Sequence, residues 1–205
     1  MSSEPVPETT DATVIPPATN EDSAAAEESK EEQKEEEPKH KNPVVFFDID
    51  IAGTYAGRIE ITLFDEVAPK TTENFLLLCT HQNDVKPSKN GLNRGTLVGF
   101  RRSTFYHSQN EFCCGGDYTR DDHGASAFEE PFFAREDCVL KHDRPGLVSM
   151  MNVTEEGKES RIVNGSHFMI TNRAIPSLDG QQVVFGEVTY GLDVLDRICK
   201  ECAFA

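Results

Sequence analysis

The chain has 205 residues with 36 acidic and 20 basic side chains, which gives a formal net charge of -16 at pH 7. That length fits one domain of ordinary size plus a tail, and such a domain can bury a core without disulfides or metal ions. The acidic excess argues against a nucleic acid or an anionic membrane surface as the main partner, since both would repel the protein.

Residues 1–42 read as an acidic tail, with 12 acidic and four basic side chains. They are rich in Glu, Pro, Ser, Thr and Ala and hold almost no large apolar residues, so we expect this segment to be disordered. It serves either to keep the protein soluble or to dock a basic partner. We expect the folded domain over residues 43–205.

The expected cellular compartment decides how the cysteines are interpreted. No apolar run reaches the roughly 18 residues needed to cross a bilayer, and the first residues lack a signal-peptide pattern. We therefore expect a cytoplasmic protein, with the nucleus as the alternative, and reduced cysteines. Cys199 and Cys202 form a C-x-x-C motif, but no second pair at ligand spacing follows, so we expect no metal site and no cofactor.

The first part of the domain predicts a hairpin and a helix. Val44–Ile51 and Arg58–Phe64 are rich in β-branched and apolar residues and flank the turn sequence AGTYAG, which predicts two paired strands. A helix is predicted from Pro69 onward. Its apolar face is expected to hold Thr71, Thr72, Phe75, Leu76 and Cys79.

A long segment without periodicity follows. Thr80–Arg102 is punctuated by Gly, Pro, Asn and Lys, which predicts a surface loop. It carries the one basic patch of an acidic chain, at Lys86, Lys89, Arg94, Arg101 and Arg102. We interpret it as a solvated insertion, with an acidic partner site as the alternative.

The second part predicts more strands and a closing helix. Short strands are expected at Gly146–Asn152, His167–Thr171 and Val183–Val188, after a loop over Asp121–Glu136. The last helix is expected at Leu192–Cys202, with Leu192, Leu195 and Ile198 on its apolar face. Many short strands with two helices and long loops predict a mainly β fold, a closed antiparallel barrel capped by the helices.

The stretch Phe105–Arg120, FYHSQNEFCCGGDYTR, combines a histidine, two adjacent cysteines and a Gly-Gly turn. Together with LKHDRPGLVSMMN, NGSHFMIT and LDGQQVVFGEVTYGLDVLDRI, in this order, it resembles the cyclophilins, a family of peptidyl-prolyl cis-trans isomerases. The resemblance runs from about Pro43 to the end of the chain. It implies a barrel with a helix at each end and an outer groove that holds proline-containing peptide or protein segments.

The resemblance also implies which residues line that groove. The position of the family's catalytic arginine holds His107 here. The positions implied to contact the bound segment hold Phe112, Cys114, Met151, Asn152, His167, Met169, Ser177, Leu178 and Gln182. Phe112, Asn152 and Leu178 keep the family's residue, while most other groove positions differ from it.

The replaced arginine bears directly on activity. Rotation about an Xaa-Pro bond faces a barrier of roughly 18–20 kcal/mol, and a catalyst lowers it by aiming a donor at the imide nitrogen as the bond twists. Arginine is permanently charged and offers five donors, whereas a neutral imidazole offers one N–H.

Three functions therefore stay open. The domain binds Xaa-Pro segments with isomerase activity weakened or lost, or it is an active isomerase that assists protein folding with His107 as donor. Alternatively, the acidic tail or the basic loop makes the relevant contact.

Two further expectations follow from the resemblance. Ser177 stands where inhibitor-binding members have an aromatic residue, so we expect weak or no binding of the family's cyclic peptide inhibitor. The sequence ends at Ala205, just after the last predicted helix, where the resemblance implies one more strand. We therefore expect a barrel that lacks its last strand and has an open edge.

Overall fold

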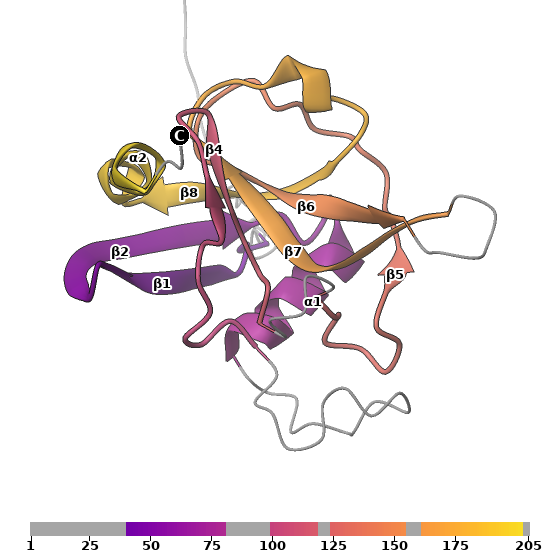
Figure 1. Cartoon of the computed structure of the whole chain (residues 1–205). Helices are drawn as coiled ribbons and strands as arrows, with labels where there is room; N and C mark the ends of the chain where they lie inside the picture. The colour runs from indigo at the N-terminus through magenta and orange to yellow at the C-terminus, as the bar shows by residue number, and fades with distance from the viewer. Residues whose placement is uncertain (1–39, 81–98, 119–123, 155–160, 203–205) are drawn as a thin grey trace, which may run out of the picture. The chain divides into compact units, whose positions relative to one another are not determined.

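The computed structural model describes residues 40–80, 99–118, 124–154 and 161–202. These residues form a curled antiparallel sheet with two helices packed against it (Figure 1). The strands are β1 (Val44–Ile51), β2 (Thr54–Leu63), β3 (His107–Ser108), β4 (Phe112–Gly115), β5 (Phe133–Ala134), β6 (Leu147–Thr154), β7 (Ile162–Thr171) and β8 (Val183–Tyr190). The helices are α1 (Pro69–Thr80) and α2 (Leu192–Glu201), with a short 3₁₀ turn η1 (Pro176–Leu178). The predicted mainly β fold with two helices is confirmed.

The sheet follows the order β1-β2-β8-β6-β7-β4-β3, and β5 pairs with β7 beside this path. All pairings are antiparallel. Within the described ranges, the path ends at β1 on one side and at β3 on the other. The strands therefore form a half-barrel with open edges, which agrees with the open-edged barrel that the family resemblance predicted, whereas the strand pattern alone predicted a closed one.

The first hairpin turns more tightly than predicted. Ala52 and Gly53 have φ values of 50° and 79°, which suits a two-residue turn whose twist matches the strands. Thr54 already pairs with Ile51, so β2 begins before the predicted Arg58. Most of the AGTYAG sequence is thus strand, because a two-residue turn needs only its first two residues.

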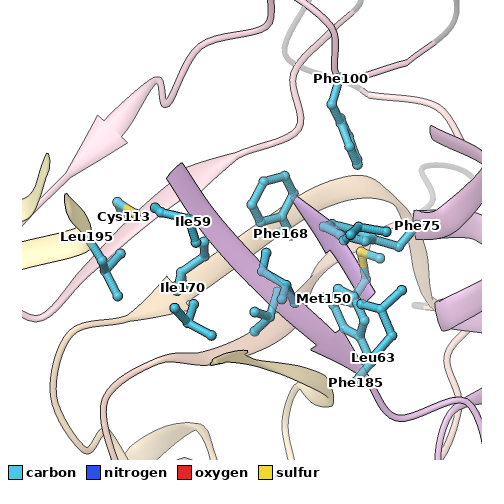
Figure 2. Packing of buried hydrophobic residues seen from close by; sticks show 14 of the residues in the cluster. Ile59, Leu63, Phe75, Phe100, Cys113, Met150, Phe168, Ile170, Phe185 and Leu195 are labelled. Atoms are coloured by element: carbon cyan, nitrogen blue, oxygen red, sulfur yellow. The ribbon is translucent and has the colours of Figure 1, made fainter. Parts of the chain in front are cut away.

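The core is built around an aromatic cluster on the inner face of the sheet (Figure 2). The ring of Phe75, on α1, lies with its centroid 4.9 to 6.1 Å from those of Phe47, Phe100, Phe168 and Phe185. Most of these contacts are edge-to-face, the arrangement that aromatic quadrupoles favour. The cluster ties α1 to β1, β7 and β8.

Phe100 corrects the loop prediction. It lies in the segment predicted as a surface loop, yet only 6% of its surface is exposed. Its amide donates to the carbonyl of Leu78, which returns the chain to the end of α1. The predicted apolar face of α1 also shifts, because Leu78 is fully buried while Leu76 and Cys79 are only partly covered.

The closing helix α2 covers the sheet near β2, β3 and β4. Its buried side chains are Val194, Leu195, Ile198 and Cys199. The prediction for Leu192 is wrong, since this first residue of the helix is 46% exposed. Spacing explains the difference, because 194, 195, 198 and 199 form one complete stripe at helical period and 192 lies beside it.

The C-x-x-C motif is divided between the core and the helix end. Cys199 is buried, and the Cys113 thiol donates a hydrogen bond to its sulfur, which raises the pKa of Cys113. Cys202 is half-buried at the end of α2. No group of three His, Cys, Asp or Glu side chains suited to a metal ion occurs within the described part of the chain.

The predicted loop Asp121–Glu136 contains β5 and a cap for α1. The carboxylate of Glu136 accepts hydrogen bonds from the amides of Lys70 and Thr71, at 3.1 and 2.8 Å. It also accepts from the Thr71 hydroxyl at 2.7 Å. The first-turn amides of a helix lack partners within the helix, so this distant carboxylate fixes both the helix end and the loop.

Several predictions fall outside the described residues. These are the acidic tail up to residue 39 and the basic side chains of Lys86, Lys89 and Arg94. Arg101 and Arg102, which are described, are exposed. In the described parts of the chain, no helix combines the length and the apolar character that a membrane span requires.

Candidate peptide-binding groove

The candidate groove lies on the outer face of β3, β4, β7 and β6. Because side chains alternate along a strand, Cys113, Ile170 and Val148 point into the core, where all three are fully buried. Their neighbours point outward, and the pairing register aligns them across four strands. Cys114 lies opposite both His107 and Met169, and Met169 lies opposite Ser149. We call the set His107, Cys114, Met169 and Ser149 the outer row.

His107 begins the outer row. It is the first residue of β3 and is half-buried, and its ring centroid is 5.7 Å from that of Phe112. A tight turn between β3 and β4 sets this distance, since the amide of Gln109 donates to the Phe112 carbonyl at 2.8 Å. The residue at the predicted donor position thus lies beside the predicted pocket aromatic.

Cys114 and Met169 form the middle of the outer row and are almost fully buried, with 2% and 4% of their surface exposed. Burial raises the pKa of the Cys114 thiol to about 12. A thiol with so high a pKa stays protonated near neutral pH and is a poor nucleophile. The middle of the row is therefore neutral and rich in sulfur.

Met151 follows the outer row on β6, at a break in the strand pairing. Met150 pairs with Phe168 and Asn152 pairs with Asn164, so the single residue Met151 lies opposite three residues of β7, and β7 carries the irregularity. The Met151 carbonyl accepts a hydrogen bond from the Asn164 side chain at 3.0 Å. The Met151 sulfur lies 3.4 Å from the Tyr106 hydroxyl, which places its side chain on the same outer surface as the row.

Tyr106 joins Met151 to His167 and was missed by the sequence analysis. Its hydroxyl lies 3.0 Å from Nδ1 of His167 and 3.4 Å from the sulfur of Met151. The centroids of the Tyr106 and His167 rings are 5.3 Å apart. Strict alternation along β3 would place Tyr106 opposite to His107, on the inner face, and this is why the pattern gave no signal for it.

The remaining predicted residues lie on or beside η1. Ser177 is exposed and Leu178 is half-buried. Gln182, just after the turn, accepts a hydrogen bond at 3.0 Å from Ser149 of the outer row. Asn152 donates to the carbonyl of Gln181 at 2.8 Å. Two side chains of β6 therefore hold the η1 segment against the groove, and alternation from Met151 could have identified Ser149.

His142 anchors the other side of η1. Its amide donates to the Asp179 carboxylate at 2.7 Å, and its carbonyl accepts from the amide of Ile175 at 2.8 Å. Its ring is buried, and burial lowers the pKa of His142, although the Asp179 carboxylate at 3.4 Å opposes this effect. The folded state therefore favours the neutral form of the His142 imidazole.

Comparison with known families completes the description of this surface. The family model described as cyclophilin type peptidyl-prolyl cis-trans isomerase/CLD matches residues 46–203. The chain belongs to the cyclophilin-type peptidyl-prolyl cis-trans isomerase family. The resemblance read from the sequence motifs is confirmed, and cyclophilins bind proline-containing peptide substrates. The match spans every predicted groove residue, from His107 to Gln182.

One cavity of this cyclophilin domain lies outside the candidate groove. It has a volume of about 350 Å³, and its lining includes Phe64, Leu147 and the ion pair between Arg144 and Glu187. None of the predicted site residues lines it. The candidate groove is therefore defined by strand register and side-chain contacts, and its roles in binding and catalysis stay predictions.

Proposed function

We propose that this cyclophilin-type domain binds Xaa-Pro segments of protein partners in the outer groove and catalyses their isomerisation weakly or not at all. The observation that carries the proposal is the position of His107. It stands in register with Cys114 and beside Phe112, where an imidazole replaces the charged donor that the family resemblance implies.

The middle of the groove supports binding more than catalysis. Half-buried Met151 offers polarizable, apolar surface of the kind that packs well against a proline ring, and the nearly buried Cys114 and Met169 form an apolar floor beside it. None of the three provides a strong hydrogen-bond donor. Catalysis needs interactions that strengthen in the transition state, and these side chains contribute almost equally to the planar and the twisted bond.

The second candidate is an active isomerase with His107 as donor. Its support is the family itself and the contact between His107 and Phe112, which places an N–H beside the aromatic ring. An imidazole hydrogen bond to a twisting bond is weaker than one from arginine, because charge-assisted bonds are roughly twice as strong.

A protease-coupled prolyl-peptide assay on the full chain separates the two candidates. We expect the chain to accelerate isomerisation at least about tenfold less than an ordinary cyclophilin, since loss of one transition-state donor typically costs 10²–10³ in rate. Activity within tenfold of an ordinary cyclophilin that also disappears in His107→Ala would establish the second candidate instead.

Binding is measured separately, by fluorescence anisotropy with labelled Xaa-Pro peptides. We expect the wild type to bind and Met169→Asp to lose binding, because a buried carboxylate would lie in the middle of the outer row. Tyr55→Asp, at an exposed position of β2, serves as the matched control. Absence of binding by the wild type would refute the proposal.

The acidic segment remains a separate proposal. If residues 1–42 dock a basic partner, deleting them should remove that partner from a pull-down without changing peptide binding. If they act only to keep the protein soluble, the set of partners will be unchanged while the protein precipitates more readily. The expected cytoplasmic location is tested by imaging the tagged chain.

A further inference from the structure

Tyr106 connects three strands at one end of the groove. Its amide donates to the Cys114 carbonyl at 3.1 Å, which fixes its backbone to β4. Its hydroxyl lies 3.0 Å from His167 Nδ1 on β7 and 3.4 Å from the Met151 sulfur on β6. The side chain therefore crosses the outer surface between the two strands that continue the groove beyond the outer row.

His167 has little freedom to move away from Tyr106. On its other side lies Gly124, where even an added Cβ atom would collide with the His167 ring and the Ser166 hydroxyl. The Ser166 hydroxyl itself donates to the Gly116 carbonyl at 2.7 Å and is buried. Tyr106, with 38% of its surface exposed, is thus the member of this contact that a bound segment can reach.

The spacing relates Tyr106 to a bound segment. His167 is two residues from Met169 of the outer row on the same strand, which corresponds to about 7 Å at roughly 3.3 Å per residue. An extended peptide has nearly the same rise. When a proline lies over the outer row, the peptide residue one or two positions away therefore meets Tyr106.

We infer that Tyr106 is a specificity-determining residue of the groove, which limits the bound segment to a small side chain at the position that meets its ring. This inference rests on the proposed binding of Xaa-Pro segments. A glycine or alanine at that position fits below the ring, whereas a leucine or phenylalanine must displace it and break its contact with His167. The ring and the hydroxyl have separable effects, because the ring fills space and the hydroxyl holds it in place.

The test is a peptide series measured by fluorescence anisotropy on the full chain. Each labelled hexapeptide has one proline, and Gly, Ala, Leu or Phe is placed in turn at the two positions before and the two after it. We expect the wild type to disfavour Leu and Phe by about tenfold at one of these positions, a difference of 1.4 kcal/mol. Tyr106→Ala should abolish that preference. Tyr106→Phe should keep the same ranking of peptides but reduce the difference in affinity between them.

The control is Tyr190→Ala, which removes the same side chain from β8, where it is 63% exposed and outside the groove. It should leave the ranking of peptides unchanged. Binding of bulky peptides that appears only in Tyr106→Ala supports the inference. If the wild type binds but Tyr106→Ala keeps the same ranking, or weakens all peptides equally, the inference is wrong and the proposed function survives. If no variant binds any peptide, both are refuted.

Discussion

The two faces of β4 and β7 have different roles in the molecule. Inward residues such as Cys113, Phe168 and Ile170 are buried in the hydrophobic core. Outward residues on the same strands, Cys114 and Met169, lie in the candidate groove. Adjacent residues therefore serve different purposes, and a chain can keep the family's core packing while its groove chemistry changes.

The largest expected effect is on the inner face. Phe75→Ala removes a fully buried ring that contacts four other aromatic rings. We expect a loss of about 3–5 kcal/mol in the free energy of unfolding, measured by chemical denaturation. The matched control is Phe46→Ala, at a position that is 55% exposed, with an expected loss of about 0.5 kcal/mol. Equal losses would contradict the assignment of the two faces.

On the outer face, His107→Arg restores the charged donor. We expect the isomerisation rate to rise about 10²-fold in the protease-coupled assay, the size typical of one transition-state donor. Stability should change little, because His107 is only half-buried. Gln109→Arg adds the same charge at an exposed position in the adjacent turn and should not raise the rate. A similar rise in both variants would point to a general charge effect.

Gly116 lies where β4 leaves the sheet, between the two faces. It has a φ of 97°, and an added Cβ would collide with the Ser166 carbonyl oxygen. Gly116→Ala should cost about 2–3 kcal/mol in the free energy of unfolding. Gly53→Ala has a similar φ of 79° but open space around it, and should cost about 1 kcal/mol. Equal losses of unfolding free energy in the two variants would contradict the close approach of Gly116 to the Ser166 carbonyl.

The smallest effect is a pH dependence from His142. Its folded pKa is lowered, so the unfolded state binds the proton first and stability falls as pH drops below about 6.5. The slope is at most about 1.4 kcal/mol per pH unit for one proton. We expect His142→Gln to flatten the free energy of unfolding between pH 7.5 and 5.5, measured by urea denaturation.

His40 gives the opposite sign and serves as the control. A hydrogen bond with Asp65 at 2.7 Å raises the pKa of His40, so its contribution is present below pH about 6.5 and is lost as pH rises through the raised folded value. Removing it in His40→Asn should therefore abolish the loss of stability that His40 causes as pH rises above about 6.5, and leave the fall below pH 6.5 in place. A flat profile in His40→Asn would show that His142 does not titrate differently in the folded state.

Much of the fold could be predicted, because the strands and helices have strong periodic patterns and long family motifs. The helix predicted from Pro69 and the strand predicted at Val183–Val188 agree closely with α1 and β8. Phe100 could not be placed, because an isolated aromatic in an aperiodic segment gives no sign of which way it faces. Leu192 shows the same limit at a helix end. The helical period alone does not settle whether the first residue of a helix belongs to its buried stripe.

The site was less accessible to sequence reasoning than the fold. Family motifs supplied the positions of His107 and Phe112, and the structure places their rings side by side. Tyr106 was missed because its contacts with β6 and β7 involve residues 45 and 61 positions away. Such contacts depend on strand register and on the departure from alternation before β3, and neither can be read from a local pattern.

The interrupted strand pairing opposite Met151 has a consequence for how this groove can diverge. The Met151 carbonyl is satisfied by the Asn164 side chain rather than by a partner in the ladder. Because its side chain projects from a point where the pairing is already interrupted, position 151 can accept residues of different size with little disturbance to the strands around it. Substitutions at position 151 can therefore change ligand preference with little cost to folding, which makes this position a natural starting point for directed evolution of the groove.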